Sequence, residues 1–150
     1  MISYATPDLT HYPPRSPRVR LGGYVHLPRL LDKARAFAAG KNGEYNYNCG
    51  LDRRFFTFTG IDAEAFLAAV KTGKGDTAML AWVTENAKPA RAAWEIEAWS
   101  RWVEALGPGD AERHAGFAED IKELAPSRED IRTNFDRLEL DDYISFGGTA

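Results

Sequence analysis

The chain has 150 residues, of which 44% are hydrophobic and 27% are charged, and its formal net charge at pH 7 is -3. This length and composition suit one ordinary globular domain with its own core, and they exclude a disordered chain. One cysteine cannot form an internal disulfide, which excludes a secreted disulfide scaffold. The first residues lack the basic and apolar segments of a secretory signal, and no stretch approaches the ~20 apolar residues of a membrane span. We therefore expect a cytoplasmic protein of one domain, residues 1–150, with no membrane contact.

The charges are unevenly distributed along the chain. Residues 11–42 contain seven Lys and Arg and one Asp, whereas residues 109–150 contain five Lys and Arg and eleven Asp and Glu. One interpretation is that the two stretches neutralise each other across the fold. The other is that the basic stretch holds an anion, either a small ligand or an acidic segment of a partner protein. The negative net charge argues against nucleic acid as the partner, because free nucleic-acid binders are usually basic overall.

The N-terminal segment, residues 1–27, is predicted to be an irregular arm, because its prolines prevent a regular helix. The first helix is predicted over residues 27–40, where apolar residues recur with a helical period. The charged residues of this helix fall on the opposite face, which we expect to be solvated: Arg29, Asp32, Lys33 and Arg35.

The ten residues that follow, GEYNYNCGLD at 43–52, lack a helical pattern, and we expect an extended loop. A short helix is then predicted to run to Thr59 with Asp52 as its N-cap. Farther along the chain, further N-caps are predicted from the positions of acidic residues before apolar runs: Asp62, Asp76 and Asp110.

The last helices complete the predicted fold. The longest spans residues 90–107, and its three tryptophans fall on one broad face that we expect to be buried: Trp94, Trp99 and Trp102. Ser127 and Asp130 have the spacing of a capping box, which predicts the start of one more helix. The sequence thus predicts an all-α fold, a compact domain of about six or seven short helices with the Pro-rich arm packed along it.

Motifs for metal or cofactor chemistry are missing from the sequence. The three histidines, His11, His26 and His114, are far apart and have no partner at a metal-ligand spacing. The glycine patterns of dinucleotide and phosphate loops are also absent. We therefore expect no metal site and no cofactor.

Cys49 is the one candidate nucleophile of the thiol type. A working thiol needs a nearby cation or helix N-terminus and usually a base, and His26 is the candidate base of the N-terminal region. The alternative is a structural thiol, which is favoured because cysteine is among the most often buried residues. The polar neighbours Asn48 and Asp52 are then the more interesting members of the loop.

Several segments carry a resemblance to a known family. They are DLTHYPPRSPR from Asp8, LGGYVHLPRLLDKARA from Leu21, GEYNYNCGLD from Gly43 and a C-terminal FGG. Together they resemble the bacterial domain-of-unknown-function family 5069 over nearly the whole chain. The family is uncharacterised, so the resemblance implies no reaction. Gly50 departs from the proline that the family pattern has there, which loosens the turn before the next helix.

The resemblance also implies a pocket where the arm, the first helix and the loop meet. The polar residues that match the family pattern are Arg15, Ser16, Arg18, Arg29, Asp32, Lys33, Arg35, Tyr45, Cys49 and Asp52. As ligand-binding residues we predict a subset of these together with one asparagine of the loop: Arg15, Arg18, Arg29, Asp32, Lys33, Tyr45 and Asn48.

Three hypotheses on function stay open at this point. The first is a binding module, in which the basic arm and first helix hold a small anion or an acidic partner segment. The second is a small enzyme that uses Cys49 or Asp52, with His26 or Tyr45 assisting, on an anionic substrate. The third is a purely structural or interaction protein, and it predicts that Arg15 and Arg18 are buried against acids of the C-terminal helices.

Overall fold

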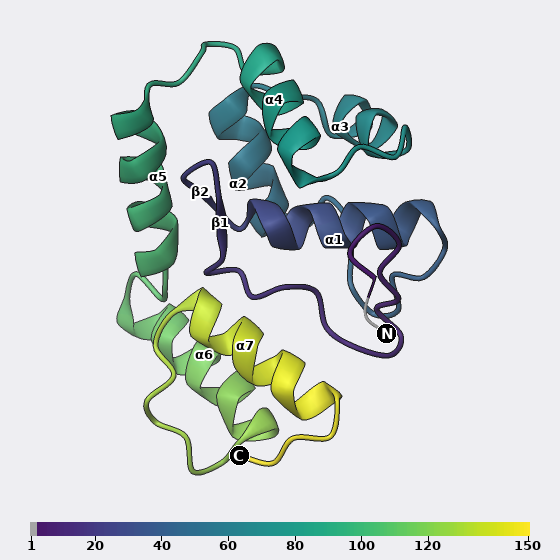
Figure 1. Cartoon of the computed structure of the whole chain (residues 1–150). Coiled ribbons are helices and arrows are strands. Elements are labelled where there is room, and N and C mark those ends of the chain that lie inside the picture. The colour runs from purple at the N-terminus through teal and green to yellow at the C-terminus, as the bar shows by residue number, and fades with distance from the viewer. Residues whose placement is uncertain (1–2) are drawn as a thin grey trace.

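The computed structural model describes residues 3–150 and shows a mostly helical chain folded around a central helix (Figure 1). The elements of this part of the chain are β1 (Arg20–Leu21), β2 (Tyr24–Val25), α1 (Leu27–Ala38), α2 (Gly50–Thr59), α3 (Ala63–Val70), α4 (Asp76–Asn86), α5 (Ala93–Ala105), α6 (Ala111–Leu124) and α7 (Asn134–Ser145). The predicted all-α fold is confirmed. None of these helices has the length and apolar character that crossing a membrane requires.

The arm contains one regular feature that the sequence analysis did not predict. β1 and β2 form an antiparallel hairpin with Arg20 opposite Val25, and the turn consists of Gly22 and Gly23, both at positive φ. The φ of 58° at Gly22 favours glycine, and a Cβ there would come within 2.4 Å of the Leu80 side chain of α4, which would have to shift. The hairpin brings the chain directly into α1.

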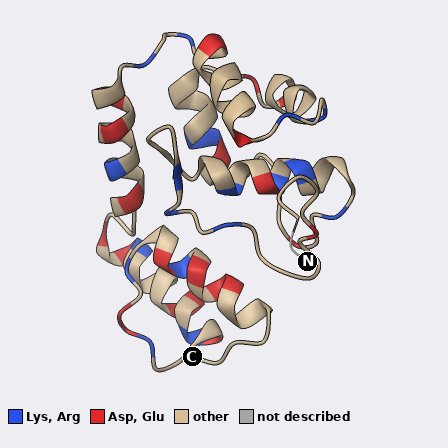
Figure 2. Ribbon diagram, in the orientation of Figure 1, with Lys and Arg blue, Asp and Glu red and all other residues tan. Residues whose placement is uncertain are grey.

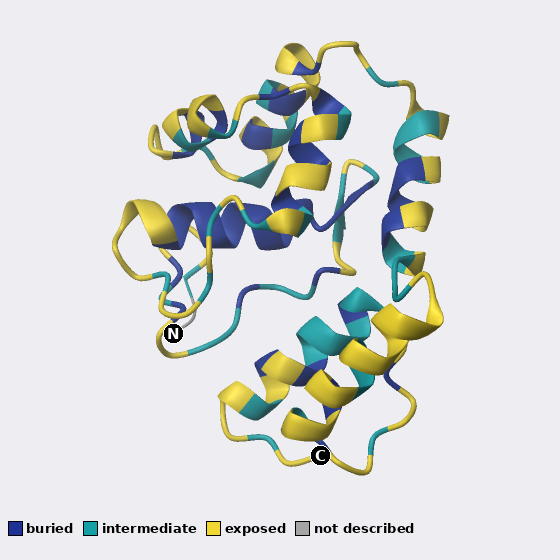
Figure 3. Cartoon of the chain, turned by 180° about the vertical axis from the view of Figure 1, so that it is seen from behind, coloured by how far each residue is buried: buried dark blue, intermediate teal, exposed yellow. Residues whose placement is uncertain are grey.

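Helix α1 is far more buried than its pattern predicts. Its first ten residues, Leu27 to Ala36, are all buried, and Figure 3 shows the helix as a buried rod at the centre of the molecule. The prediction of a solvated charged face is therefore wrong. The arm and the loop before α2 cover that face, and carboxylates and backbone carbonyls meet its charged side chains there. An amphipathic pattern cannot reveal such a cover, because the covering segments are irregular.

Two hydrophobic clusters hold the helices. The larger one combines α1 to α5 with the hairpin, and edge-to-face aromatic contacts such as Tyr24–Phe55, with ring centroids 5.4 Å apart, run through it. Phe135 of α7 also belongs to this cluster. The smaller cluster lies between α6 and α7 and includes Ile121 and Leu140. Helix α7 thus joins the two clusters.

Some predicted helix starts need correction. Cys49, not Asp52, is the N-cap of α2, and Asp52 sits at the third helical position, where its carboxylate accepts the backbone N–H of Cys49. Helix α7 starts after Thr133 rather than at Ser127, since the Thr133 side chain accepts the N–H of Asp136. In both cases the cap lies three residues before the acidic residue, which is the reciprocal geometry of a capping box.

Two further predictions concern the remaining N-caps and the tryptophans. Asp62 and Asp110 cap α3 and α6 as predicted. Asp76 is the first residue of α4 rather than its cap. Trp99 is buried and stacks on Phe58, but the two other tryptophans of α5 are exposed, Trp94 to 73% and Trp102 to 51%. The predicted buried face was too broad, because only one side of α5 faces the core.

Charges of the arm and of the C-terminal helices meet across the fold. Figure 2 shows acidic residues along α7, beside the arm that runs between this helix and α1. Arg18 binds Asp136 and Glu139, and Arg29 binds Asp142. Much of the charge difference between the two ends of the sequence is therefore neutralised within the molecule.

We predict that Ser100→Ala loosens the hairpin. The buried Ser100 hydroxyl accepts the N–H of Val25 at 3.1 Å and donates to the carbonyl of Gly23 at 2.7 Å. The variant leaves both backbone groups without this partner, which costs about 1–3 kcal/mol. Urea unfolding followed by circular dichroism measures the loss.

Thr84→Ala is the matched control, because the exposed Thr84 hydroxyl only donates to Leu80 of its own helix. Its free energy of unfolding should change by less than about 0.5 kcal/mol. Equal unfolding midpoints for the two variants would show that Ser100 does not hold the hairpin.

Candidate functional site

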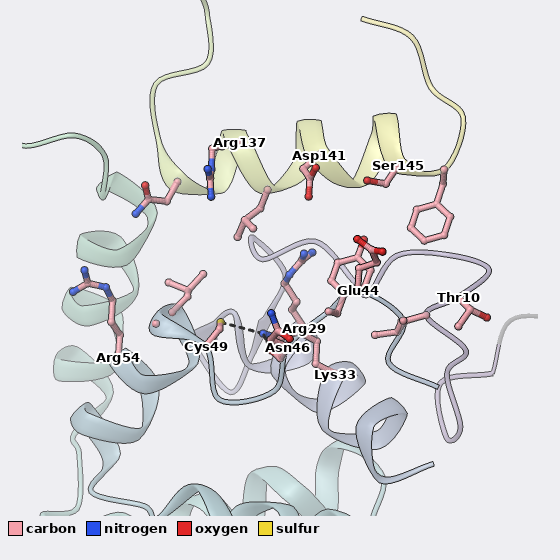
Figure 4. A pocket seen from close by; sticks show the side chains of 18 residues that line it. Thr10, Arg29, Lys33, Glu44, Asn46, Cys49, Arg54, Arg137, Asp141 and Ser145 are labelled. Carbon is pink, nitrogen blue, oxygen red and sulfur yellow. Dashed lines mark hydrogen bonds between the residues drawn. The ribbon is translucent and has the colours of Figure 1, made fainter. Parts of the chain in front are cut away.

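A cleft of about 1140 Å³ lies between the loop before α2 and helix α7 (Figure 4). Four of the residues proposed from the sequence line it: Arg29, Lys33, Tyr45 and Cys49. Other predicted site residues do not line it: Arg15, Arg18, His26, Asp32, Asn48 and Asp52. The predicted pocket therefore exists in part, and its far wall is a helix that the sequence analysis did not assign to it.

Lys33 is the central cation of the near wall. Its ammonium group donates to the Asp52 carboxylate at 2.8 Å, to the carbonyl of Asn46 at 3.1 Å and to the Cys49 sulfur at 3.3 Å. The side chain is only 5% exposed. All three donors of the ammonium group are thus used, and they tie α1 to the loop and to the start of α2.

Asp52 is fully buried behind this wall. Its carboxylate accepts hydrogen bonds from His26 Nε2 at 2.7 Å, Lys33 Nζ at 2.8 Å and the Cys49 amide at 3.2 Å. Burial alone would raise the pKa of Asp52, but the His26 hydrogen bond and the Lys33 charge outweigh it and lower the pKa to about 2. The carboxylate is ionised at neutral pH and faces its partners rather than the cleft.

His26 is buried in an unusual conformation. Its φ of 70° is left-handed, a region that residues other than glycine adopt rarely, and its ring stacks on Phe135 at 6.5 Å between centroids. Burial lowers the pKa of His26 despite the opposing effect of Asp52. The neutral ring then donates from Nε2, while Nδ1 has no hydrogen-bond partner among the described residues. His26 thus supports Asp52 from inside the core, out of reach of a ligand.

A second ion pair joins the two walls of the cleft. Arg29 of α1 donates to both carboxylate oxygens of Asp142 in α7, at 2.7 and 3.1 Å, and the Tyr45 hydroxyl donates to the same carboxylate at 2.7 Å. Burial and this hydrogen bond raise the pKa of Tyr45 well above its usual value. The phenol is therefore a hydrogen-bond donor, not a base, at neutral pH.

The arginines of the arm have structural contacts. Arg15 binds Asp32 of α1 at 3.0 Å and Asp76 of α4 at 2.7 Å, so it fastens the arm to the main helices and not to the C-terminal ones. Arg18 does bind acids of α7, but its side chain is 41% exposed. The architectural hypothesis predicted buried pairs with C-terminal acids for both: Arg15 is 21% exposed and has other partners, and Arg18 has the predicted partners but is exposed.

Sequence reasoning missed several residues that line the cleft. Arg54 of α2 lies over the Trp102 ring at 5.4 Å, and Arg137 of α7 pairs with Asp120 at 3.2 Å. Glu44 and Asp141 line the cleft as well. The only usable signal was the helical spacing of Arg137 and Asp141, four residues apart and thus on one face. The juxtaposition of α2 and α7 is a long-range effect of packing, and no local pattern reveals it.

No metal site is suggested by this arrangement. Within residues 3–150, no group of three or more His, Cys, Asp and Glu side chains is placed to hold a metal ion.

The comparison with known families agrees with the resemblance seen in the sequence. The model of the domain of unknown function DUF5069 matches residues 11–144. The chain belongs to this family. A search of curated proteins found no match. The match covers the arm from residue 11, the loop before α2 and the helices as far as residue 144.

We predict that Asp52→Asn destabilises the fold by about 3–5 kcal/mol at pH 7, because it leaves the buried Lys33 ammonium without a counter-ion. It also changes the response to acid. The folded pKa of Asp52, about 2, lies below the usual aspartate value of 3.8, so its stabilisation is complete above pH 3.8 and is lost as the pH falls towards 2. Unfolding by urea between pH 7 and pH 2 measures both effects.

Over the acidic part of this range, the free energy of unfolding of the wild type should fall by on the order of 2 kcal/mol more than that of the variant. Glu85→Gln is the control, since Glu85 is exposed in α4 and makes no ion pair within the described residues. Parallel stability curves for wild type and Asp52→Asn would contradict the ionised state assigned to Asp52.

Proposed function

We propose that this protein is a binding module whose cleft holds a small ligand by an anionic group, either a carboxylate or a phosphate. The observation that supports it most is the pair Arg54 and Arg137, which project from opposite walls at one end of the cleft (Figure 4). Arg54 has no carboxylate partner within residues 3–150. A guanidinium group presents paired donors that match carboxylate and phosphate oxygens.

The first turn of α2 adds to this end of the cleft. Gly50 and Leu51 line it, and backbone N–H groups in the first turn of a helix have no partner within the helix. Such groups favour anions, and the helix dipole has the same effect. Arginine side chains and helix amides thus offer donors to one anionic group.

The proposed contacts differ from those expected from the sequence. Arg15 and Arg18 bind carboxylates of their own chain outside the cleft, and the charges of Arg29 and Lys33 are balanced by Asp142 and Asp52. A cation that already holds a carboxylate has less attraction left for a ligand. Anion binding therefore moves to Arg54, which has no carboxylate partner among the described residues, and to Arg137, whose pair with Asp120 at 3.2 Å is exposed to water on both sides and therefore weak.

The size of the cleft limits the kind of ligand. Its volume of about 1140 Å³ lies slightly above the usual range of small-molecule sites, which is roughly 300–1,000 Å³. A bare inorganic anion fills a small part of that space, so the ligand extends beyond its anionic group. We place the protein in the bacterial cytoplasm as part of this proposal, in keeping with its single cysteine and its resemblance.

We predict that Arg54→Gln and Arg137→Gln each weaken the binding of phosphate and of pentanoate about tenfold, because each removes one charge-assisted contact. Titration followed by ¹H–¹⁵N NMR suits weak ligands and reports which amides respond. The amides of Gly50 and Leu51 should shift in the wild type.

Arg113→Gln is the control, since Arg113 is an exposed arginine of α6 outside the cleft, and its variant should bind as the wild type does. If neither probe binds the wild type, or if both arginine variants bind with unchanged affinity, the proposal is wrong.

A second candidate function is a small enzyme with Cys49 as its nucleophile. The observation that favours it is the Lys33 ammonium at 3.3 Å from the sulfur of a thiol that lines the cleft and begins a helix. Nucleophilic cysteines occur in such electropositive surroundings. Asp52 and His26 are fully buried, so in this reading they position Lys33 and do not touch the substrate.

Thiol alkylation tests this candidate. If Cys49 is a nucleophile, iodoacetamide at pH 7 reacts with it faster than with free cysteine, and Lys33→Met slows the reaction. Mass spectrometry of the intact chain follows the single added group, since the chain has one cysteine. The urea-unfolded protein gives the reference rate. A native rate no higher than this reference would exclude a nucleophilic Cys49.

A further inference from the structure

Charges of opposite sign are separated along the cleft. Arg54 and Arg137 lie towards one end, on opposite walls, and Glu44 and Asp141 lie farther along, as Figure 4 shows. Each pair has one member on the near wall and one on α7. Glu44 and Asp141 are exposed and have no ion-pair partner in the part of the chain that the structure describes.

The cations between these two pairs add little net charge. Arg29 is held by Asp142 at 2.7 Å, and Lys33 is held by Asp52 at 2.8 Å, and neither carboxylate is among the residues that line the cleft. The field inside the cleft therefore comes mainly from its two ends, one basic and one acidic. A ligand with two anionic groups would place the second one beside Glu44 and Asp141, where like charges repel it.

We propose that the ligand is zwitterionic, with its anionic group bound by Arg54 and Arg137 and an ammonium group bound by Glu44 and Asp141. This inference rests on the proposed function and narrows it to one class of ligand. The two signs also fix the direction in which the ligand lies, because the reversed orientation brings like charges together at both ends.

The spacing of the charges on α7 sets the length of the ligand. Arg137 and Asp141 are four residues apart in a helix, which is a rise of about 6 Å. Two extended peptide residues span at most about 7 Å. The opposite charges of the ligand are thus separated by roughly the length of a dipeptide or of a five-carbon amino acid. An α-amino acid, whose two charged groups share one carbon, is too short.

A matched series of five-carbon probes tests the inference by NMR titration: 5-aminopentanoate, pentanoate, pentylamine and glutarate. In this order, the four probes carry one charge of each sign, one negative charge, one positive charge and two negative charges. We expect 5-aminopentanoate to bind at least tenfold more tightly than any of the others. Amides around Glu44 and Asp141 should respond to it and not to pentanoate.

The double variant Glu44→Gln with Asp141→Asn isolates the acidic end. This variant should no longer bind 5-aminopentanoate more tightly than pentanoate, and its affinity for pentanoate should be unchanged or higher. The control is Glu85→Gln with Glu112→Gln, which removes two exposed acids outside the cleft and should still bind 5-aminopentanoate more tightly.

The outcomes separate this inference from the proposed function. Equal affinities for pentanoate and 5-aminopentanoate, both weakened by Arg54→Gln, overturn the zwitterion and leave anion binding in place. Absence of binding by all four probes and by phosphate overturns both the zwitterionic ligand and anion binding.

A comparison with the dipeptide Ala-Ala and its N-acetyl form identifies whether the ligand is a peptide or a free amino acid. If Ala-Ala binds more tightly than 5-aminopentanoate, the cleft is assigned to peptides, and if 5-aminopentanoate binds more tightly, it is assigned to free amino acids. Equal affinities for Ala-Ala and its N-acetyl form count against a bound ammonium group.

Discussion

The arrangement of the site depends on the carboxylate of Asp52. It receives hydrogen bonds from the residue before α1, from the middle of α1 and from the residue before α2, which are His26, Lys33 and Cys49. One fully buried anion thereby fixes the direction of two helices and the end of the loop between them. Because Lys33 is bound in this way, it is also held in place to contact the Cys49 sulfur and the Asn46 carbonyl at the cleft wall.

Buried ion pairs of this kind determine how the segments of the fold are arranged more than they stabilise the fold. Moving two charges out of water costs several kcal/mol for each ion, and their attraction roughly offsets this cost only when the geometry is good. In α1 this condition is fulfilled for the charged side chains Arg29, Asp32, Lys33 and Arg35, each of which has a partner of opposite charge. We infer that these pairs define where the arm, the loop and α7 lie on α1, while the aromatic cluster supplies most of the stabilising burial.

The sequence predicted the helices well because their signals are local. Apolar residues with helical spacing and the caps at Asp62 and Asp110 depend on near neighbours, and the structure agrees with them. The two-residue strands were missed because a hairpin this short has no alternating pattern. The cap at Cys49 was missed because cysteine is not among the usual N-cap residues.

The candidate site could be predicted only in part, for a physical reason. The family pattern pointed to Arg29, Lys33, Tyr45 and Cys49, which come from adjacent stretches of the chain, and these do line the cleft. The same pattern gave no means to distinguish an arginine that clamps the arm, such as Arg15, from one that faces the cleft. Charge and residue type are identical in the two roles, and only the position of the partner carboxylate separates them.

The chain thus uses most of its basic N-terminal stretch for its own assembly. Under the proposed function, the ligand contacts come from residues without a distinctive pattern in the sequence, on α2, on the loop and on α7. Helix α7 is anchored to the rest by Phe135 in the large cluster, by Asp142 on Arg29 and by the contacts of Arg18 with Asp136 and Glu139, and these contacts together hold the far wall of the cleft in place. Glu44, Arg54, Arg137 and Asp141 line the cleft but take no part in the buried pairs that hold α1, whereas Arg29 and Lys33 line the cleft and belong to those pairs. Under the proposed function, the internal ion pairs determine the architecture, while Glu44, Arg54, Arg137 and Asp141 determine which ligand binds.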